Sequence, residues 1–314
     1  MIDFRYHIVS IVAIFFALGA GVVLGAGPLK GTGSDLVQAQ ANKDRATVED
    51  QRQQLLQAKA LDKYRDDYVA KVTAGLTDGK LANKRIALVT MPNATGDMTD
   101  LIQEAIEQAG GQVTTRVSLD SKLFDPGQRQ LVEPLVNDLV TSDIQFPAES
   151  NTYQRAGMIL ARGIAAKEEA KPVDSESTKI INGLASAKLV SLKTPKDRAS
   201  LIVVVAAKPP TPVPDNSSYN DAVDFSEGLD EASAGVVVAG MPASAENGGL
   251  LKSLRGDADA TKALSSVDVA DIPSGRATVV FALVEQASGK AGQYGGVDAK
   301  NGVAPSADMV KGNN

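Results

Sequence analysis

The amino-terminal part of the chain divides into an apolar segment and a polar segment, both with helical character. Residues 8–29 carry no charged side chain, and Ser10 is their only hydroxyl-bearing residue. As a helix this segment spans about 33 Å, enough for a bilayer core of about 30 Å. Residues 34–74 follow without a glycine or a proline. We therefore predict a transmembrane helix at residues 8–29 and a long helix at residues 34–75.

A cleaved signal peptide is the alternative interpretation of residues 8–29, because Gly25-Ala26-Gly27 offers small residues for a cleavage site. The apolar run is longer than the usual core of about 7–15 residues in a signal peptide, and Asp3 stands beside the lone Arg5. These features favour an uncleaved anchor. We expect residues 1–7 on the cytoplasmic side and the large polar remainder outside, as one translocated domain.

Small residues recur every four positions in the apolar segment, at Ala17, Gly21 and Gly25. This spacing allows two membrane helices to approach closely, and we predict that these residues pack between helices. The alternative is that glycine and alanine are simply common in membrane helices.

The long helix carries apolar and small residues at alternating spacings of four and three. This seam is interrupted by Asp44 and Gln51, and it consists of Val37, Ala41, Val48, Leu55 and Ala58. The pattern predicts a dimeric or trimeric coiled coil. A solitary, solvated helix is the alternative, since the helix is highly charged and its seam is weak.

From residue 81 onward, short apolar runs alternate with amphipathic segments. We predict buried strands at residues 85–90, 112–119, 201–206 and 235–240, and helices at residues 97–109, 128–140, 152–167, 175–188 and 219–231. Residues 278–284 fit a strand or a buried helix, and Ser274 and Gly289 favour the helix. Such alternation predicts an α/β domain over residues 81–292 with a Rossmann- or flavodoxin-like, doubly wound, mostly parallel sheet. Residues 293–314 are expected to form a flexible tail.

The composition excludes several classes of chemistry. The chain has no Cys and one His, which excludes disulfides, thiolate nucleophiles and a Ser-His-Asp triad in the α/β domain, because that His is residue 7. Its formal net charge of −6 argues against nucleic-acid binding. We therefore predict a protein that is not an enzyme, with no cofactor and no nucleic-acid partner.

Two motifs resemble phosphate-binding loops without matching them. The turn at residues 90–97 follows the first strand of the α/β domain, but it lacks a Gly-x-Gly-x-x-Gly pattern and places Asp97 at the helix start. We interpret it as a plain capped turn. The glycine-rich residues 289–296 come after the last helix, so we interpret them as a helix stop that leads into a turn.

Carboxylates and methionines give no recognisable metal site. Asp97, Asp100, Glu104 and Glu107 share one helix face, which is typical of a solvated surface. A partial calcium-loop pattern fails because Lys262 takes the glycine position and Asp268 replaces the glutamate; it consists of Asp257, Asp259, Thr261 and Asp268. The Met residues are scattered, and His7 adjoins the membrane segment.

Three stretches together resemble the actinobacterial copper transport protein B family. They are the opening at residues 1–10, which runs into residues 17–25, the long Gln-rich helix, and the late stretch from Ser266 to Gly295. The likeness covers essentially the whole chain, and its first part is the most specific. In the late stretch the family leads us to expect a His before the Tyr, where this chain has Gln293.

The resemblance implies a pore-forming envelope protein that keeps cellular copper low, placed in the outer membrane, with copper ion as the transported species. The chain itself favours a single-pass envelope protein that forms a homo-oligomer through the span and the coiled coil, because its strands are too few and too short for a transmembrane barrel. The alternative is a non-transporting envelope scaffold that presents the α/β domain to a partner on a coiled-coil stalk.

Overall fold

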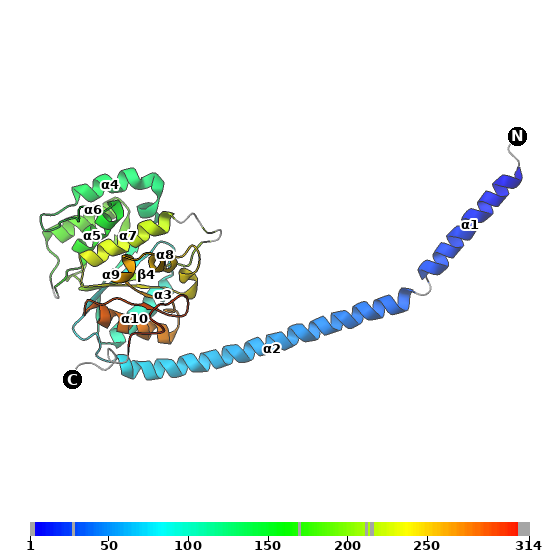
Figure 1. The fold of residues 1–314 in the computed structure, drawn as a ribbon, viewed down its shortest axis with the longest axis horizontal. Helices are drawn as coiled ribbons and strands as arrows, with labels where there is room; N and C mark the ends of the chain where they lie inside the picture. The colour runs from blue at the N-terminus through cyan, green and yellow to red at the C-terminus, as the bar shows by residue number, and fades with distance from the viewer. Residues whose placement is uncertain (1–3, 27–28, 169–170, 211–212, 214–216, 307–314) are drawn as a thin grey trace. The chain divides into compact units, whose positions relative to one another are not determined.

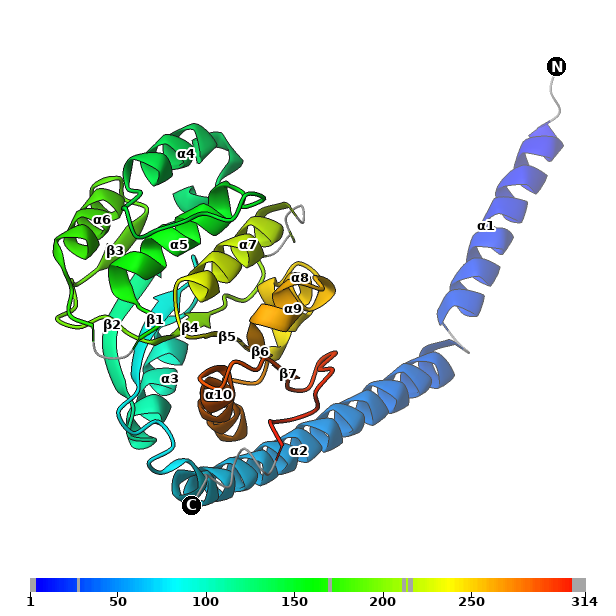
Figure 2. The same cartoon turned by 60° about the vertical axis from the view of Figure 1, so that its left-hand side comes forward.

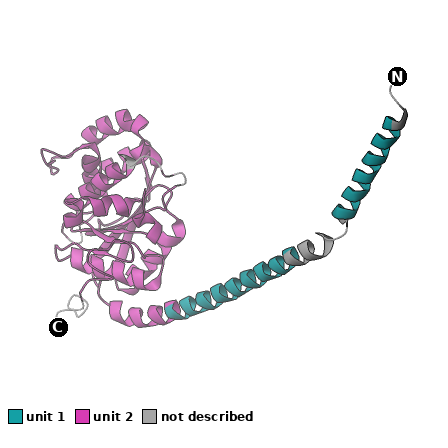
Figure 3. Cartoon of the chain, turned by 45° about the vertical axis from the view of Figure 1, so that its right-hand side comes forward, with its two compact units in different colours: residues 1–65 teal, residues 66–314 magenta. Residues whose placement is uncertain are grey.

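The computed structural model describes residues 4–26, 29–168, 171–210, 213 and 217–306. The chain forms two compact units, residues 1–65 and residues 66–314 (Figure 3). The first unit is helical, whereas the second contains the whole α/β domain.

The first unit contains α1 (Phe4–Ala26) and most of α2 (Leu29–Thr77). Among the described residues, α1 holds the one helical segment that is long and apolar enough to cross a membrane, Tyr6–Gly25, with a mean hydropathy of 2.6. Residues 27 and 28 of the predicted span lie outside the described residues. The predicted apolar helix is thus present, and it begins closer to the amino terminus than the sequence indicates.

The long helix α2 has 49 residues, so it is about 74 Å long. Polar side chains one turn apart support it, because Gln40 donates to Asp44 at 2.8 Å and Gln54 donates to Asp50 at 2.9 Å. It begins five residues before the predicted start. The coiled coil stays a prediction.

The second unit is built on a seven-stranded sheet (Figure 1). In the order β3-β2-β1-β4-β5-β6-β7, the strands are Val190–Leu192, Gln112–Leu119, Arg85–Thr90, Leu201–Val205, Val236–Ala239, Ser265–Val267 and Gln293–Tyr294. All neighbouring strands are parallel except β2 and β3, which are antiparallel. This confirms the predicted mostly parallel α/β sheet, and the order of the first six strands is that of a Rossmann fold.

Helices cover both faces of the sheet (Figure 2). On one face lie α3 (Gly96–Gln108) and α10 (Pro273–Gln286). The other face is covered by α4 (Arg129–Asp138), α5 (Thr152–Ile164), α6 (Ser175–Ser186), α7 (Ser217–Glu231) and the short helices α8 (Leu250–Gly256) and α9 (Ala260–Ala263). Short 3₁₀ turns η1 (Ser121–Phe124), η2 (Pro126–Gln128) and η3 (Pro242–Ala245) complete the loops on this side.

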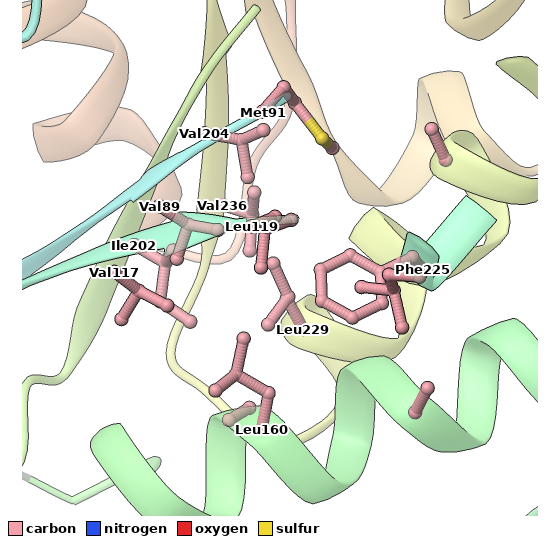
Figure 4. Close-up of a cluster of buried hydrophobic side chains, with 14 of the residues drawn as sticks. Val89, Met91, Val117, Leu119, Leu160, Ile202, Val204, Phe225, Leu229 and Val236 are labelled. Atoms are coloured by element: carbon pink, nitrogen blue, oxygen red, sulfur yellow. The ribbon is translucent and has the colours of Figure 1, made fainter. Parts of the chain in front are cut away.

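Two hydrophobic cores result from the alternation of side chains along each strand. Ala87 and Val89 of β1 point into the larger core, while Ile86 and Leu88 point into the core beneath α3 and α10. Figure 4 shows the larger core, where strand residues meet Leu160 of α5 and Phe225 of α7. The central strands β1, β4 and β5 are buried on both faces among apolar side chains, which is why they appear in the sequence as continuous hydrophobic runs.

The shortest elements differ from the prediction, which did not include them. β3, β6 and β7 have three residues or two, too few to show a period, and β6 is disguised by Ser265 and Ser266. The ambiguous residues 278–284 belong to α10, which confirms the favoured helix.

The carboxyl-terminal segment also differs from the expected tail. Gln293 and Tyr294 form β7, and the chain beyond them turns back so that Asn301 N–H donates to the Gln293 carbonyl at 2.9 Å. Regular structure therefore extends beyond residue 292, because buried hydrogen bonds hold the glycine-rich segment to the sheet. Residues 307–314 of the predicted tail lie outside the described residues.

Candidate functional sites

The small residues of α1 are open to contact. No heavy atom lies within 4 Å of a Cβ built on Gly21 or Gly25, which with Ala17 form the predicted packing positions. The same is true of Gly19, two residues earlier and therefore about 200° around the helix. Packing between copies through Ala17, Gly21 and Gly25 stays a prediction.

The acidic face of α3 is engaged in ordinary surface contacts. Asp100 accepts a hydrogen bond from Arg116 Nη2 at 2.6 Å, and Glu107 accepts one from Gln103 at 2.6 Å. Glu104 accepts from Gln108 at 3.0 Å. Asp97 lies in the first turn of the helix, where its carboxylate interacts favourably with the helix dipole. This face is therefore a solvated surface.

The residues of the partial calcium pattern point to different partners. Asp257 Oδ1 accepts from the backbone N–H groups of Asp259 and Ala260, so it caps α9. Asp259 pairs with Lys262 at 2.8 Å. Asp268 is fully buried and pairs with Arg255. The three carboxylates thus have structural roles.

The turn after β1 differs in one respect from the predicted capped turn. Asn93 adopts a left-handed φ of 66°, and Thr95, at the start of α3, makes no side-chain capping bond. The carbonyl of Thr95 instead accepts the N–H of Thr99 at 3.5 Å. The turn therefore lacks the predicted side-chain cap, and its plain, non-binding role stays a prediction.

A buried polar network, which sequence analysis missed, organises the glycine-rich motif. Arg255 of α8 donates to Asp268 at 2.6 Å, to Ser266 Oγ at 2.9 Å and to the Tyr294 carbonyl at 2.7 Å. Asp268 also accepts from the N–H groups of Gly296 and Val297. A Cβ at Gly295, whose φ is +134°, would lie 1.8 Å from Asp268 Oδ1, so this position requires glycine. An Arg ten residues before a strand does not indicate such a network in the sequence.

Gln293 belongs to the same network. Its side chain, in a residue only 2% exposed, accepts from Ser266 Oγ at 2.5 Å and donates to the Leu264 carbonyl at 2.8 Å. A neutral imidazole also accepts at one nitrogen and donates at the other. The position at which the resemblance leads us to expect His is therefore a buried structural position.

Next to it, the Tyr294 hydroxyl donates to Glu285 of α10 at 2.6 Å. Burial and the neighbouring carboxylate raise the pKa of Tyr294, so the phenol stays protonated. This bond fastens β7 to α10. The stretch around Gln293 and Tyr294 thus holds the edge strand β7 to the rest of the domain.

An acidic cavity of about 300 Å³ lies between α5, α7 and α9. Its lining includes Glu149, Glu227, Asp230 and the thioether of Met158. Burial raises the pKa of Asp230 to about 7, and Glu231 and Glu227 act in the same direction. Within the described residues, no three His, Cys, Asp or Glu side chains are grouped closely enough to hold a metal ion.

Comparison with known proteins gives the family. The profile of the family described as "Copper transport outer membrane protein, MctB" matches residues 1–305. The chain is 28% identical to "Copper transporter MctB" of Mycobacterium tuberculosis (strain ATCC 25618 / H37Rv) over 316 aligned residues, which cover 94% of this chain and 96% of the relative. It is 26% identical to the protein of the same name from Mycobacterium leprae (strain TN), with the same coverage. The chain therefore belongs to the MctB family of copper transport proteins.

Proposed function

We propose that this protein is a single-pass, non-enzymatic envelope protein that helps to export copper and so keeps intracellular copper low. The observation that carries the proposal is the family match over nearly the whole chain, including α1, α2 and the closing strand β7. Relatives that cover 94% of the chain are named copper transporters. An outer-membrane position is part of the proposal and rests on the family description alone.

The anchor in this proposal is α1. Its 23 residues correspond to about 34 Å, and the segment Tyr6–Gly25 contains no Asp, Glu, Lys or Arg. A charge-free helix offers no ion pathway by itself. Copper would therefore cross through an assembly, made of several copies or of partner subunits.

Self-association through α1 and α2 would build such an assembly. Gly21 and Gly25 leave the surface of α1 open to a second helix. On α2, Val48 and Leu55 stand seven residues apart and are 63% and 56% exposed. Two adjacent apolar surfaces on one membrane-anchored chain favour parallel association of copies.

The rival proposal is a non-transporting scaffold that presents the α/β domain to an envelope partner. The lack of a metal-holding group among the described residues supports it. Planar bilayers containing the purified full chain distinguish the two, since conductance at increasing protein density supports a pore. Silent bilayers at every density would remove the pore and favour the scaffold.

The experiment that tests the copper proposal measures cell-associated copper in a deletion strain under a fixed copper load. We expect copper to rise on deletion and to return with the full chain. Gly21→Leu should fail to restore it because the side chain blocks close helix contact, whereas Gly19→Leu, on the opposite face of α1, should restore it. Unchanged copper on deletion would contradict the proposal.

A further inference from the structure

A cavity opens at the carboxyl ends of β1, β2 and β4. It measures about 220 Å³ and is lined by described residues that follow these strands and by residues in the amino-terminal halves of α7 and α8. β1 and β4 are neighbours in the sheet, yet β1 leads into α3 on one face and β4 leads into α7 on the other. The crevice at such a switch point is where open α/β sheets bind ligands.

The floor of the cavity is apolar and preformed. It consists of Met91, Phe124, Ala222 and Leu250, each at most 8% exposed. The ring of Phe124 is held from behind, with its centroid 6.0 Å from that of Tyr153 and 5.6 Å from that of Phe225. These two ring contacts restrict the rotation of the Phe124 side chain. A dry cavity of about 150 Å³ binds benzene, so this floor accommodates a phenyl ring or a branched alkyl group.

The rim of the cavity carries one charge of each sign. Lys208 follows β4 and Asp125 follows η1, and both are exposed. In the described part of the chain, neither forms an ion pair with the other or with another residue. Asp125 Oδ1 accepts from Gly127 N–H at 2.9 Å, which fixes the carboxylate and leaves Oδ2 available. Pro209 follows Lys208 and restricts the backbone there.

We propose that this cavity binds a small zwitterion with an apolar side group, the chemistry of a large apolar α-amino acid. The carboxylate faces Lys208 and the amino terminus of the 15-residue helix α7, the ammonium faces Asp125, and the side group lies on the apolar floor. A molecule with a single charge complements one rim residue and is repelled by the other. The proposal does not depend on copper transport.

Nucleotides fit this site poorly. A pyrophosphate in a Rossmann-type site lies at the helix that follows β1, and there Asp97 places a carboxylate in the first turn of α3. The cavity is instead lined by α7 and α8, which cover the face of the sheet opposite to α3. Its ligand is therefore a small molecule without a phosphate chain.

The test uses the full chain in lipid nanodiscs with ¹³C-methyl methionine and L-phenylalanine as the probe. We expect a saturable shift of the Met91 methyl resonance, while Met98 in the other core and Met158 on α5 stay unmoved. 3-Phenylpropionate lacks the ammonium and phenethylamine lacks the carboxylate, so each should bind at least about five-fold more weakly. Equal binding of the three compounds, or no saturable shift, would overturn the proposal.

Matched variants distinguish a loss of binding in the cavity from a general effect of substitution on the protein. Ala222→Leu fills the floor and should abolish the Met91 shift, whereas Ala185→Leu on the exposed face of α6 should leave it unchanged. Lys208→Gln should weaken phenylalanine but not phenethylamine, and the exposed Lys193→Gln should weaken neither. The Met98 resonance reports whether each variant is folded. Wild-type binding in a folded Ala222→Leu protein would also overturn the proposal.

Discussion

Arg255 Nη1 donates to Asp268 Oδ2 at 2.6 Å, and the two side chains are 3% and 0% exposed. This pair joins α8, the end of β6 and the loop after β7 at one buried point. Two charges can be retained inside a protein only when their hydrogen bonds are satisfied, and here the surrounding carbonyl, hydroxyl and N–H groups satisfy them. The pair is therefore the centre from which the carboxyl-terminal segment is held to the sheet.

Removing one member of this pair should destabilise the protein strongly. We expect Arg255→Ala to lower the free energy of unfolding by about 3–5 kcal/mol, since it leaves the Asp268 carboxylate buried without its partner. Lys252→Ala breaks the exposed contact to Asp298 at 2.7 Å and should change the free energy of unfolding far less, because water screens this pair. Denaturant unfolding of the full chain in detergent measures both. A double variant, Arg255→Met with Asp268→Leu, should recover part of the loss, and no recovery would contradict this account.

Gln293 should tolerate an imidazole but not an apolar side chain. Gln293→His keeps one acceptor for Ser266 and one donor for the Leu264 carbonyl, so we expect a small change in Tm. Gln293→Leu leaves the Ser266 hydroxyl proton without its acceptor and the Leu264 carbonyl without this donor, and each buried loss costs about 1–3 kcal/mol. Copper binding to the purified Gln293→His protein should remain absent at this position. A copper-dependent rise in its Tm would show that the position can act as a ligand.

Asp230 should make stability depend on pH. Its pKa is raised to about 7 in the folded protein, against about 3.9 in an unfolded chain. The folded state therefore binds a proton more tightly, and stability falls as the pH rises from about 4 to about 7. Asp230→Asn removes this dependence, so its Tm should exceed that of the wild type by more at pH 8 than at pH 5. An equal difference in Tm at pH 5 and at pH 8 for Asp230→Asn would refute the assignment.

The central elements could be predicted from sequence, and the elements at the edge of the sheet could not. The runs at β1, β4 and β5 are buried on both faces, so each strand is continuously apolar and readable. β6 and β7 instead depend on Ser266, Gln293 and Arg255, whose hydrogen bonds form only in the folded chain. These polar residues are far apart in the sequence and form no regular pattern from which a strand could be predicted. For the same reason the cavity beside β4 had no signal beyond the position of the switch point.

Two glycines allow α5 and α7 to pack closely against each other. A Cβ at Gly157 of α5 would lie 2.1 Å from the Phe225 carbonyl oxygen, and one at Gly228 of α7 would lie 1.9 Å from the Gln154 carbonyl oxygen. Gly157→Ala should therefore force α5 and α7 apart and destabilise the protein by about 1–3 kcal/mol, the usual range for overpacking. Gly256→Ala is the matched control, because no atom lies within 4 Å of its Cβ position and alanine favours the helix. Thermal unfolding compares them, and equal Tm values would show that the helices can move apart freely.

The apolar seam of α2 should determine the association of copies. Leu55 is 56% exposed in a single chain, and Val48 stands one heptad before it. Leu55→Glu places a charge in the seam and should lower the association constant measured by sedimentation at least about ten-fold, which corresponds to about 1.4 kcal/mol. Gln57→Glu adds the same charge about 200° away around the helix and should leave the oligomer fraction unchanged. If both variants, or neither, reduced the oligomer fraction, the seam would have no specific role, and α2 would be a solvated spacer between α1 and the α/β unit.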